Sequence, residues 1–162
     1  MARDTLMTWK IGTAIFALLM AVAVYLLVRQ NPPTLLEPFQ ITNALLGDQP
    51  GIFGSAPSLF YTLSIGLLVG VFASTLASSQ LHCLVWIGLA LCLEISQASI
   101  ISIPLVSGLS SILPDSTWEL IGPYWANGVF DPLDLLATTV GGVIALAMLT
   151  YLPREGKDDV DR

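Results

Sequence analysis

An acid and an amide inside an apolar segment are the strongest chemical signal in this sequence. Glu94 lies in a run of apolar residues, and Gln97 follows three positions later. On a helix this spacing places both side chains on the same face. A charged side chain in membrane hydrocarbon costs about 2.5–3.5 kcal/mol on insertion scales, so Glu94 should face the protein interior or water. We therefore expect Glu94 and Gln97 to belong to a buried polar pocket.

The charge of Glu94 needs an explanation, because residues 30–153 contain no Lys or Arg. Arg29 is the one basic residue expected at a compatible depth. Three alternatives remain open: an ion pair with Arg29, a protonated carboxyl, or contact with a ligand. A purely structural alternative is a hydrogen bond between helices that involves Gln97 or Ser99.

A second polar group lies at the start of the last apolar segment. Asp131 is followed by a proline, an arrangement typical of a helix N-cap. Asp134 falls in the first turn, where the helix dipole favours an acid, and Thr138 shares its face. Counting residues places Asp134 about one turn below the outer boundary and Glu94 about two turns below it. We expect these two carboxyls to share a pocket, which would leave one of them protonated or recruit a cation.

Other kinds of site have little support. His82 has no partner at metal-ligand spacing, and neither a metal nor a cofactor is predicted. Cys83 and Cys92 should point to opposite sides of a helix, and we interpret both as buried packing thiols. There is no recognisable nucleophile–base pair and no phosphate-binding glycine loop. The sequence thus predicts no particular reaction and favours a non-catalytic protein.

Composition places these residues in a membrane protein. Of the 162 residues, 54% are hydrophobic and 11% are charged, whereas a soluble domain of this size needs a more charged surface. Four apolar windows are long enough to cross about 30 Å of hydrocarbon. They predict an all-α, single-domain bundle of four transmembrane helices, followed by an acidic tail at 153–162. The predicted helices cover about 9–28, 57–77, 81–101 and 132–152.

Basic residues near the two chain ends predict the orientation in the membrane. By the positive-inside rule both termini are cytoplasmic, and the longer connections at 31–56 and 102–130 are extracytoplasmic. The same clustering leaves no basic surface for nucleic acid. The short connection near 78–80 should make the second and third helices antiparallel neighbours. The first segment lacks a cleavage site and is read as a retained helix. The terminal basic residues are Arg3, Lys10, Arg154, Lys157 and Arg162.

Small residues predict close contacts between helices. Gly66, Gly70 and Ser74 recur every four residues in the second predicted helix, and Gly141 and Gly142 lie in the fourth. Small side chains let helix backbones approach where lipid provides no hydrophobic drive for packing. The stripe in the second helix could pack against another helix of this chain or against a partner protein.

The order of these motifs resembles the VanZ-like family of small bacterial membrane proteins. The resemblance covers roughly residues 36–147: a Pro-Phe element within residues 36–41, the Glu94-x-x-Gln97 pair, and the Asp131-x-x-Asp134 pair with Thr138. This sequence lacks the Arg that the family usually carries shortly before the paired acids, and Thr138 stands where Asn is usual. The resemblance implies a multi-pass protein of the bacterial inner membrane, connected with the cell envelope and with low-level resistance to glycopeptide antibiotics of the teicoplanin kind. It implies no defined reaction.

Three functional hypotheses follow. In the first, an outer-leaflet pocket of Glu94, Gln97, Asp134 and Thr138 binds a lipid-linked or amphiphilic envelope molecule. In the second, the chain is a structural or accessory subunit of a membrane protein complex, and the glycine stripe is its interface. In the third, the carboxyl pair serves an envelope-lipid enzyme or a proton-coupled carrier, although the chain has no repeated half with broken helices. Membrane lipids are the expected partners in each case.

Overall fold

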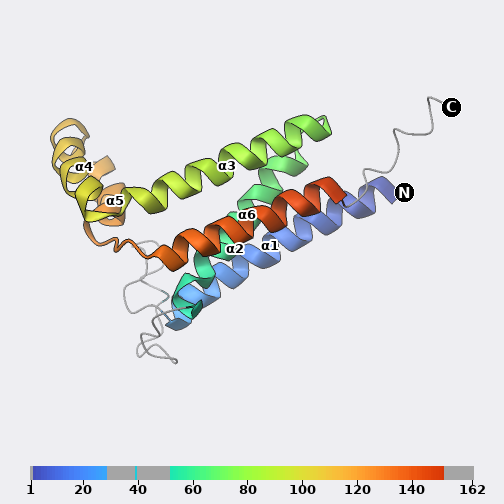
Figure 1. The fold of residues 1–162 in the computed structure, drawn as a ribbon, viewed down its shortest axis with the longest axis horizontal. Helices are drawn as coiled ribbons and strands as arrows, with labels where there is room; N and C mark the ends of the chain where they lie inside the picture. Colours follow the sequence, from blue (N-terminus) through green and yellow to red (C-terminus); the bar gives the residue numbers. More distant parts are fainter. Residues whose placement is uncertain (1, 29–38, 40–51, 152–162) are drawn as a thin grey trace.

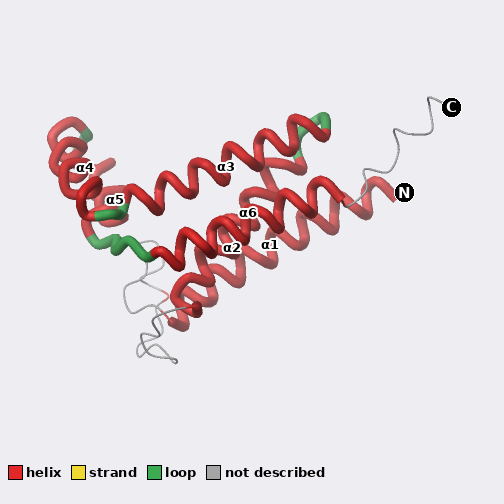
Figure 2. Tube along the Cα trace, viewed as in Figure 1, coloured by secondary structure: helices red, strands yellow, loops and turns green. Residues whose placement is uncertain are grey.

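The computed structural model describes residues 2–28, 39 and 52–151, which form six helices and, within these residues, no strand (Figure 1; Figure 2). Four of the helices are long and apolar enough to cross a membrane, as predicted. The protein is therefore an all-helical membrane protein with four candidate spans. The helices are α1 (Ala2–Val28), α2 (Ile52–Val71), α3 (Leu76–Ser96), α4 (Ser99–Ile112), α5 (Asp115–Ala126) and α6 (Pro132–Tyr151).

Helix α2 occupies the centre of the bundle, in contact with α1, α3 and α6. Helices α2 and α6 run in the same direction, because Gly66 of α2 faces Ala145 and Gly70 faces Leu149. This parallel pairing is possible because the chain passes through α3, α4 and α5 between the two helices, and so returns to the end of the bundle at which α2 begins. The start of α1 and the end of α6 lie together at the opposite end of the bundle (Figure 1).

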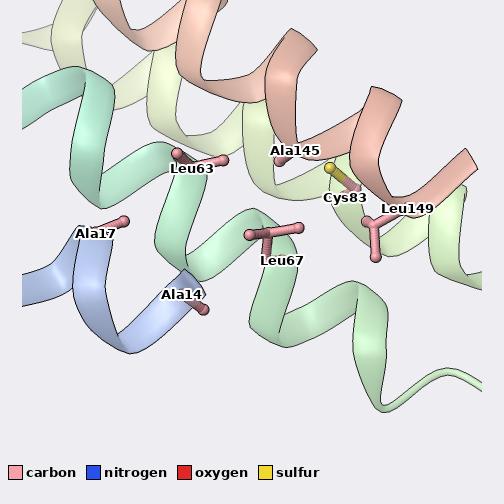
Figure 3. Packing of buried hydrophobic residues seen from close by; sticks show 7 residues of the cluster. All are labelled: Ala14, Ala17, Leu63, Leu67, Cys83, Ala145 and Leu149. Atoms are coloured by element: carbon pink, nitrogen blue, oxygen red, sulfur yellow. The ribbon is translucent and has the colours of Figure 1, made fainter. Parts of the chain in front are cut away.

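Small residues dominate the hydrophobic core. Figure 3 shows Ala14 and Ala17 of α1 beside Leu63 and Leu67 of α2, with Cys83, Ala145 and Leu149 on the other side. Alanine and cysteine leave room for helix backbones to approach, which supplies the close packing that stabilises helices in lipid. Cys83 is buried as predicted, whereas Cys92 is exposed and is not a core thiol.

The glycines predicted to lie at helix contacts all face another helix of this chain. A Cβ at Gly66 would lie 3.1 Å from the Cβ of Ala145. A Cβ at Gly70 would overlap the side chain of Leu149, and one at Gly141 would overlap the backbone of Leu59. Gly142 lies against the side chain of Ile87. Ser74 differs from this group, because α2 ends at Val71 and Ser74 is exposed in the turn that follows.

The connection between α2 and α3 lies at residues 72–75 and not near 78–80. Thr75 caps α3, and its side chain accepts a hydrogen bond from the Ser78 backbone N–H at 3.1 Å. Because Thr75 caps the helix, α3 begins before residues 78–80, which were predicted as the connection and instead form part of its first turns. The two helices contact each other as expected of a short connection.

The prediction that the second helix begins at about residue 57 is wrong. Helix α2 begins at Ile52, and Pro57 is fully buried inside it. A proline within a helix removes one backbone donor, here the partner of the Phe53 carbonyl, but membrane helices tolerate this when neighbouring helices pack against them. Helix α1 likewise begins earlier than predicted, at Ala2.

Residues 102–130, predicted only as a longer connection, contain most of α4 and all of α5. Helix α3 ends at Ser96 rather than at 101. The chain turns at Ala98, whose φ of −59° and ψ of 131° are not helical, and α4 then continues through Pro104. Apolar residues extend across this turn, so hydropathy alone gave no sign of the break.

Ser79 joins α3 to α2 at the end opposite α4. Its buried hydroxyl donates a 2.6 Å hydrogen bond to the Gly70 carbonyl. We expect Ser79→Ala to lower the free energy of unfolding by about 1 kcal/mol, because the carbonyl then loses its side-chain donor. Unfolding in mixed micelles at increasing SDS content measures this. Ser110→Ala is the control, since that hydroxyl bonds only to its own helix on the exposed face of α4. An equal loss in both variants would contradict the role of the Ser79 bond.

Candidate functional site

Glu94 is buried near the C-terminal end of α3, which leads into α4, with 7% of its surface exposed. Its Oε1 accepts hydrogen bonds from the Ser58 hydroxyl at 3.4 Å and the Tyr61 hydroxyl at 3.5 Å. These distances are at the long end of the range, so each bond is weak. Glu94 lies two residues before the end of α3, closer to the boundary of the span than the two turns expected.

Ser58 and Tyr61 of α2 are site residues that the sequence argument missed. Their three-residue spacing places both on one face of the helix, toward α3. Ser55 and Thr62 are also buried, so α2 carries a row of hydroxyl side chains through an otherwise apolar segment. This row was visible in the sequence, but serine and threonine are common enough in membrane helices that it gave no specific signal.

Tyr124 of α5 brings further polar groups to Glu94. Partial burial of Tyr124, which is 39% exposed, followed by the Glu94 carboxylate, raises the pKa of its phenol to about 12, while a hydrogen bond with Gln97 acts in the opposite direction. Tyr25 of α1 and Asp134 of α6 raise the pKa of the same phenol less strongly, so both lie within its electrostatic range. We call these residues the tyrosine–carboxylate cluster: Tyr25, Tyr61, Glu94, Tyr124 and Asp134.

A specific contact holds α5 over the end of α3. The Trp125 indole N–H donates a 2.8 Å hydrogen bond to the Ser96 hydroxyl, which itself donates to the Leu93 carbonyl at 2.6 Å. Tyr124 packs edge-on against Trp125, with ring centroids 5.3 Å apart. The indole hydrogen bond and this ring contact therefore hold Tyr124 beside the end of α3.

Gln97 occupies the junction between α3 and α4. It is the C-cap residue of α3, and its side chain lies close to Gly128, where a Cβ would come within 2.9 Å of its amide carbon. The absence of a side chain at Gly128 therefore leaves room for Gln97 beside Tyr124.

The acids and the threonine at the start of α6 have different roles. Asp131 caps the helix, because its carboxylate accepts a 2.9 Å hydrogen bond from the Leu133 backbone N–H. Asp134 is buried in the first turn with 5% of its surface exposed. Thr138 lies one turn further on the same face, completely buried, and its hydroxyl has no hydrogen-bond partner among the described residues. Asp134, and not Asp131, is thus the acid of α6 that joins the cluster.

Other sequence predictions fall outside the cluster. Ser99, considered as a partner for Glu94, is exposed at the start of α4. Arg29 lies outside the described residues, and so does the Pro-Phe element except for Phe39, which is 68% exposed. Glu94 therefore accepts hydrogen bonds from two hydroxyls of α2. None of the alternatives considered from the sequence included these hydroxyls as partners of Glu94.

The phenol of Tyr124 provides a direct test of this geometry. In a spectroscopic titration of the folded protein, Tyr124 should ionise near pH 12, above the ordinary value of 10.0. The difference between wild-type and Tyr124→Phe absorbance at the phenolate band isolates this group. Glu94→Gln should lower the pKa of Tyr124 without restoring the ordinary value, because burial is the larger cause. An unchanged pKa in that variant would place Glu94 out of range of Tyr124.

The cluster can hold a proton or accept hydrogen bonds from an amine or a hydroxyl. Ser58 is the serine that donates to Glu94, whereas the hydroxyls of Ser96 and Ser107 donate to carbonyls of their own helices. Among the described residues, no group of three or more His, Cys, Asp and Glu side chains is arranged to bind a metal ion.

Comparisons with known proteins assign no family to this geometry. No family model matches the chain, and no curated protein or solved structure matches it either. The resemblance to the VanZ-like family therefore rests on the motifs of the sequence alone.

Proposed function

We propose that this chain is a VanZ-like protein of the bacterial inner membrane whose tyrosine–carboxylate cluster binds the polar headgroup of an envelope lipid or related amphiphile. The observation that carries the proposal is the burial of Glu94 against neutral hydroxyls, in a stretch of sequence without Lys or Arg. Structural bonding alone could use a neutral side chain at lower cost. An acidic, hydroxyl-lined site favours a headgroup that carries an amine over an anionic headgroup that lacks one.

The charge distribution supports an extracytoplasmic position for the cluster. Arg3 lies in the first turn of α1, and in the sequence Arg154 comes three residues after the last residue of α6; α1 begins and α6 ends at the same end of the bundle. The positive-inside rule assigns that end to the cytoplasm. Lys10 contributes less than the sequence suggested, because it is 7% exposed and lies inside the candidate span Met7–Leu27. The cluster lies at the other end of the bundle.

The subunit hypothesis loses its principal feature in this fold. Gly66 and Gly70 pack against α3 and α6 of the same chain, so they offer no surface to another protein. A subunit role would need a different face, such as the exposed side of α1. We therefore retain lipid binding as the proposed function.

Native mass spectrometry tests the proposal. The protein is purified from its membrane in a mild detergent and also reconstituted in discs of phosphatidylethanolamine or phosphatidylglycerol. Retention of the amine-bearing lipid in preference to phosphatidylglycerol would support the proposal. Equal retention of both lipids, or a stoichiometric protein partner without bound lipid, would contradict it.

A further inference from the structure

We propose that α4 lies inside the membrane, in the leaflet at the cluster end of the bundle, with its exposed isoleucine side chains in contact with acyl chains. The helix has 14 residues, which gives a length of about 21 Å. This is too short for a hydrocarbon core of about 30 Å. The helix would therefore enter one leaflet without crossing the bilayer.

The exposed surface of α4 is apolar to a degree unusual for a face in water. Ile100 is 84% exposed, Ile103 is 69% exposed and Ile112 is 79% exposed. Within the described residues, α4 contacts α5 extensively and α3 only at their junction. Three isoleucines on one short helix would be costly in water, and apolar patches of this kind mark contacts with a membrane or with a protein.

Two further properties of α4 indicate lipid rather than water. Residues 95–114 contain no charged side chain. Three exposed serines donate their hydroxyls to carbonyls of the same helix: Ser107 to Pro104 at 3.1 Å, Ser110 to Ser107 at 3.2 Å and Ser111 to Gly108 at 2.7 Å. Water makes such bonds unnecessary, whereas hydrocarbon requires each polar group to be satisfied inside the protein.

Continuity with α3 indicates lipid rather than a second protein. The last turns of α3 expose Leu93 and Ile95, which belong to a candidate span and so face acyl chains. The apolar surface continues directly into Ile100. Charged residues return at Asp115 and Glu119 of α5, both exposed, as expected where the chain re-enters the headgroup region.

Spin labelling in liposomes tests this placement. In a chain with Cys83→Ala and Cys92→Ala, one cysteine is introduced by Ile103→Cys and labelled, and collision rates with oxygen and with a water-soluble nickel chelate are measured. Val143→Cys, on the exposed face of α6, is the lipid reference, and Ser74→Cys, in the exposed turn, is the aqueous reference. The oxygen-to-nickel ratio at position 103 should match that at 143 and exceed that at 74 several-fold.

Each other result would overturn the proposal. High nickel accessibility at position 103 would place α4 in water. Low accessibility to both reagents would show that protein covers the helix, which in purified liposomes means a second copy of the chain. Ile100→Cys repeats the measurement at the most exposed isoleucine, where a label disturbs the least packing. The outcome does not depend on whether the tyrosine–carboxylate cluster binds lipid.

Discussion

Gly141→Ala is expected to lower the free energy of unfolding by about 1–3 kcal/mol, or to prevent the bundle from assembling. The added methyl would overlap the carbonyl oxygen of Leu59 and lie 3.1 Å from its carbonyl carbon. These are backbone atoms, so the overlap is relieved only by moving α6 away from α2. That movement would also open the contacts of Gly66 and Gly70 with α6, because the two helices are rigid and parallel.

Gly88→Ala is the matched control for this prediction. Gly88 lies in α3, and a Cβ there would have no neighbour within 4 Å. The same methyl should leave stability unchanged or raise it by about 0.5–1 kcal/mol, because glycine in a helix loses more conformational freedom on folding than alanine does. Both variants can be compared by unfolding in mixed SDS micelles. Equal effects at the two positions would show that the α2–α6 contact is not as close as described.

Glu94→Gln is expected to reduce the retained amphiphile at least about tenfold while the protein stays folded. A hydrogen bond to a charged group contributes about 1.5–3 kcal/mol, which corresponds to a change of this size in affinity. The fold should survive, because the glutamine carbonyl can still accept the hydroxyls of Ser58 and Tyr61. Quantitative native mass spectrometry of the protein in phosphatidylethanolamine discs measures the retained lipid.

Glu119→Gln removes the same charge from an exposed position on α5 and should leave the retained lipid unchanged. Loss of lipid in both variants would assign the effect to net charge rather than to the cluster. Full retention in Glu94→Gln would remove Glu94 from the binding site. Circular dichroism of both variants verifies that their helical content is preserved.

The number and type of spanning helices could be predicted from the sequence, but several boundaries could not. The start of α6 was predictable because Asp131 and Pro132 form a local cap, and local signals need no tertiary information. The same reasoning placed the start of the second helix near Pro57. That start was wrong because a proline fits both the first turn of a helix and a well-packed helix interior. Helices α4 and α5 were missed because hydropathy windows are matched to the thickness of a bilayer and do not detect shorter helices.

The acids of the site could be predicted, but their partners could not. Glu94 and Asp134 could be identified from the sequence because a carboxyl in an apolar segment is energetically costly. Tyr61 and Tyr124 come from two different helices, and only the packing of α2 and α5 brings both of them to Glu94. Their positions depend on helix rotation and crossing, which a single sequence does not specify.

The hydrogen bonds that join α3 to its neighbouring helices are shorter at one end than at the other, and this difference affects how α3 can tilt. At one end, Ser79 and Gln80 bind α2 and α6 through hydrogen bonds of 2.6 and 3.1 Å, whereas the bonds between Glu94 and α2 at the other end are 3.4 and 3.5 Å long. Fifteen residues separate Ser79 from Glu94, a lever arm of about 22 Å. A tilt of about 5° around Ser79 would displace the carboxyl by about 2 Å, and α5 would travel with it through Trp125. A small tilt of α3 about Ser79 would therefore be large enough at Glu94 to make or break its hydrogen bonds with α2.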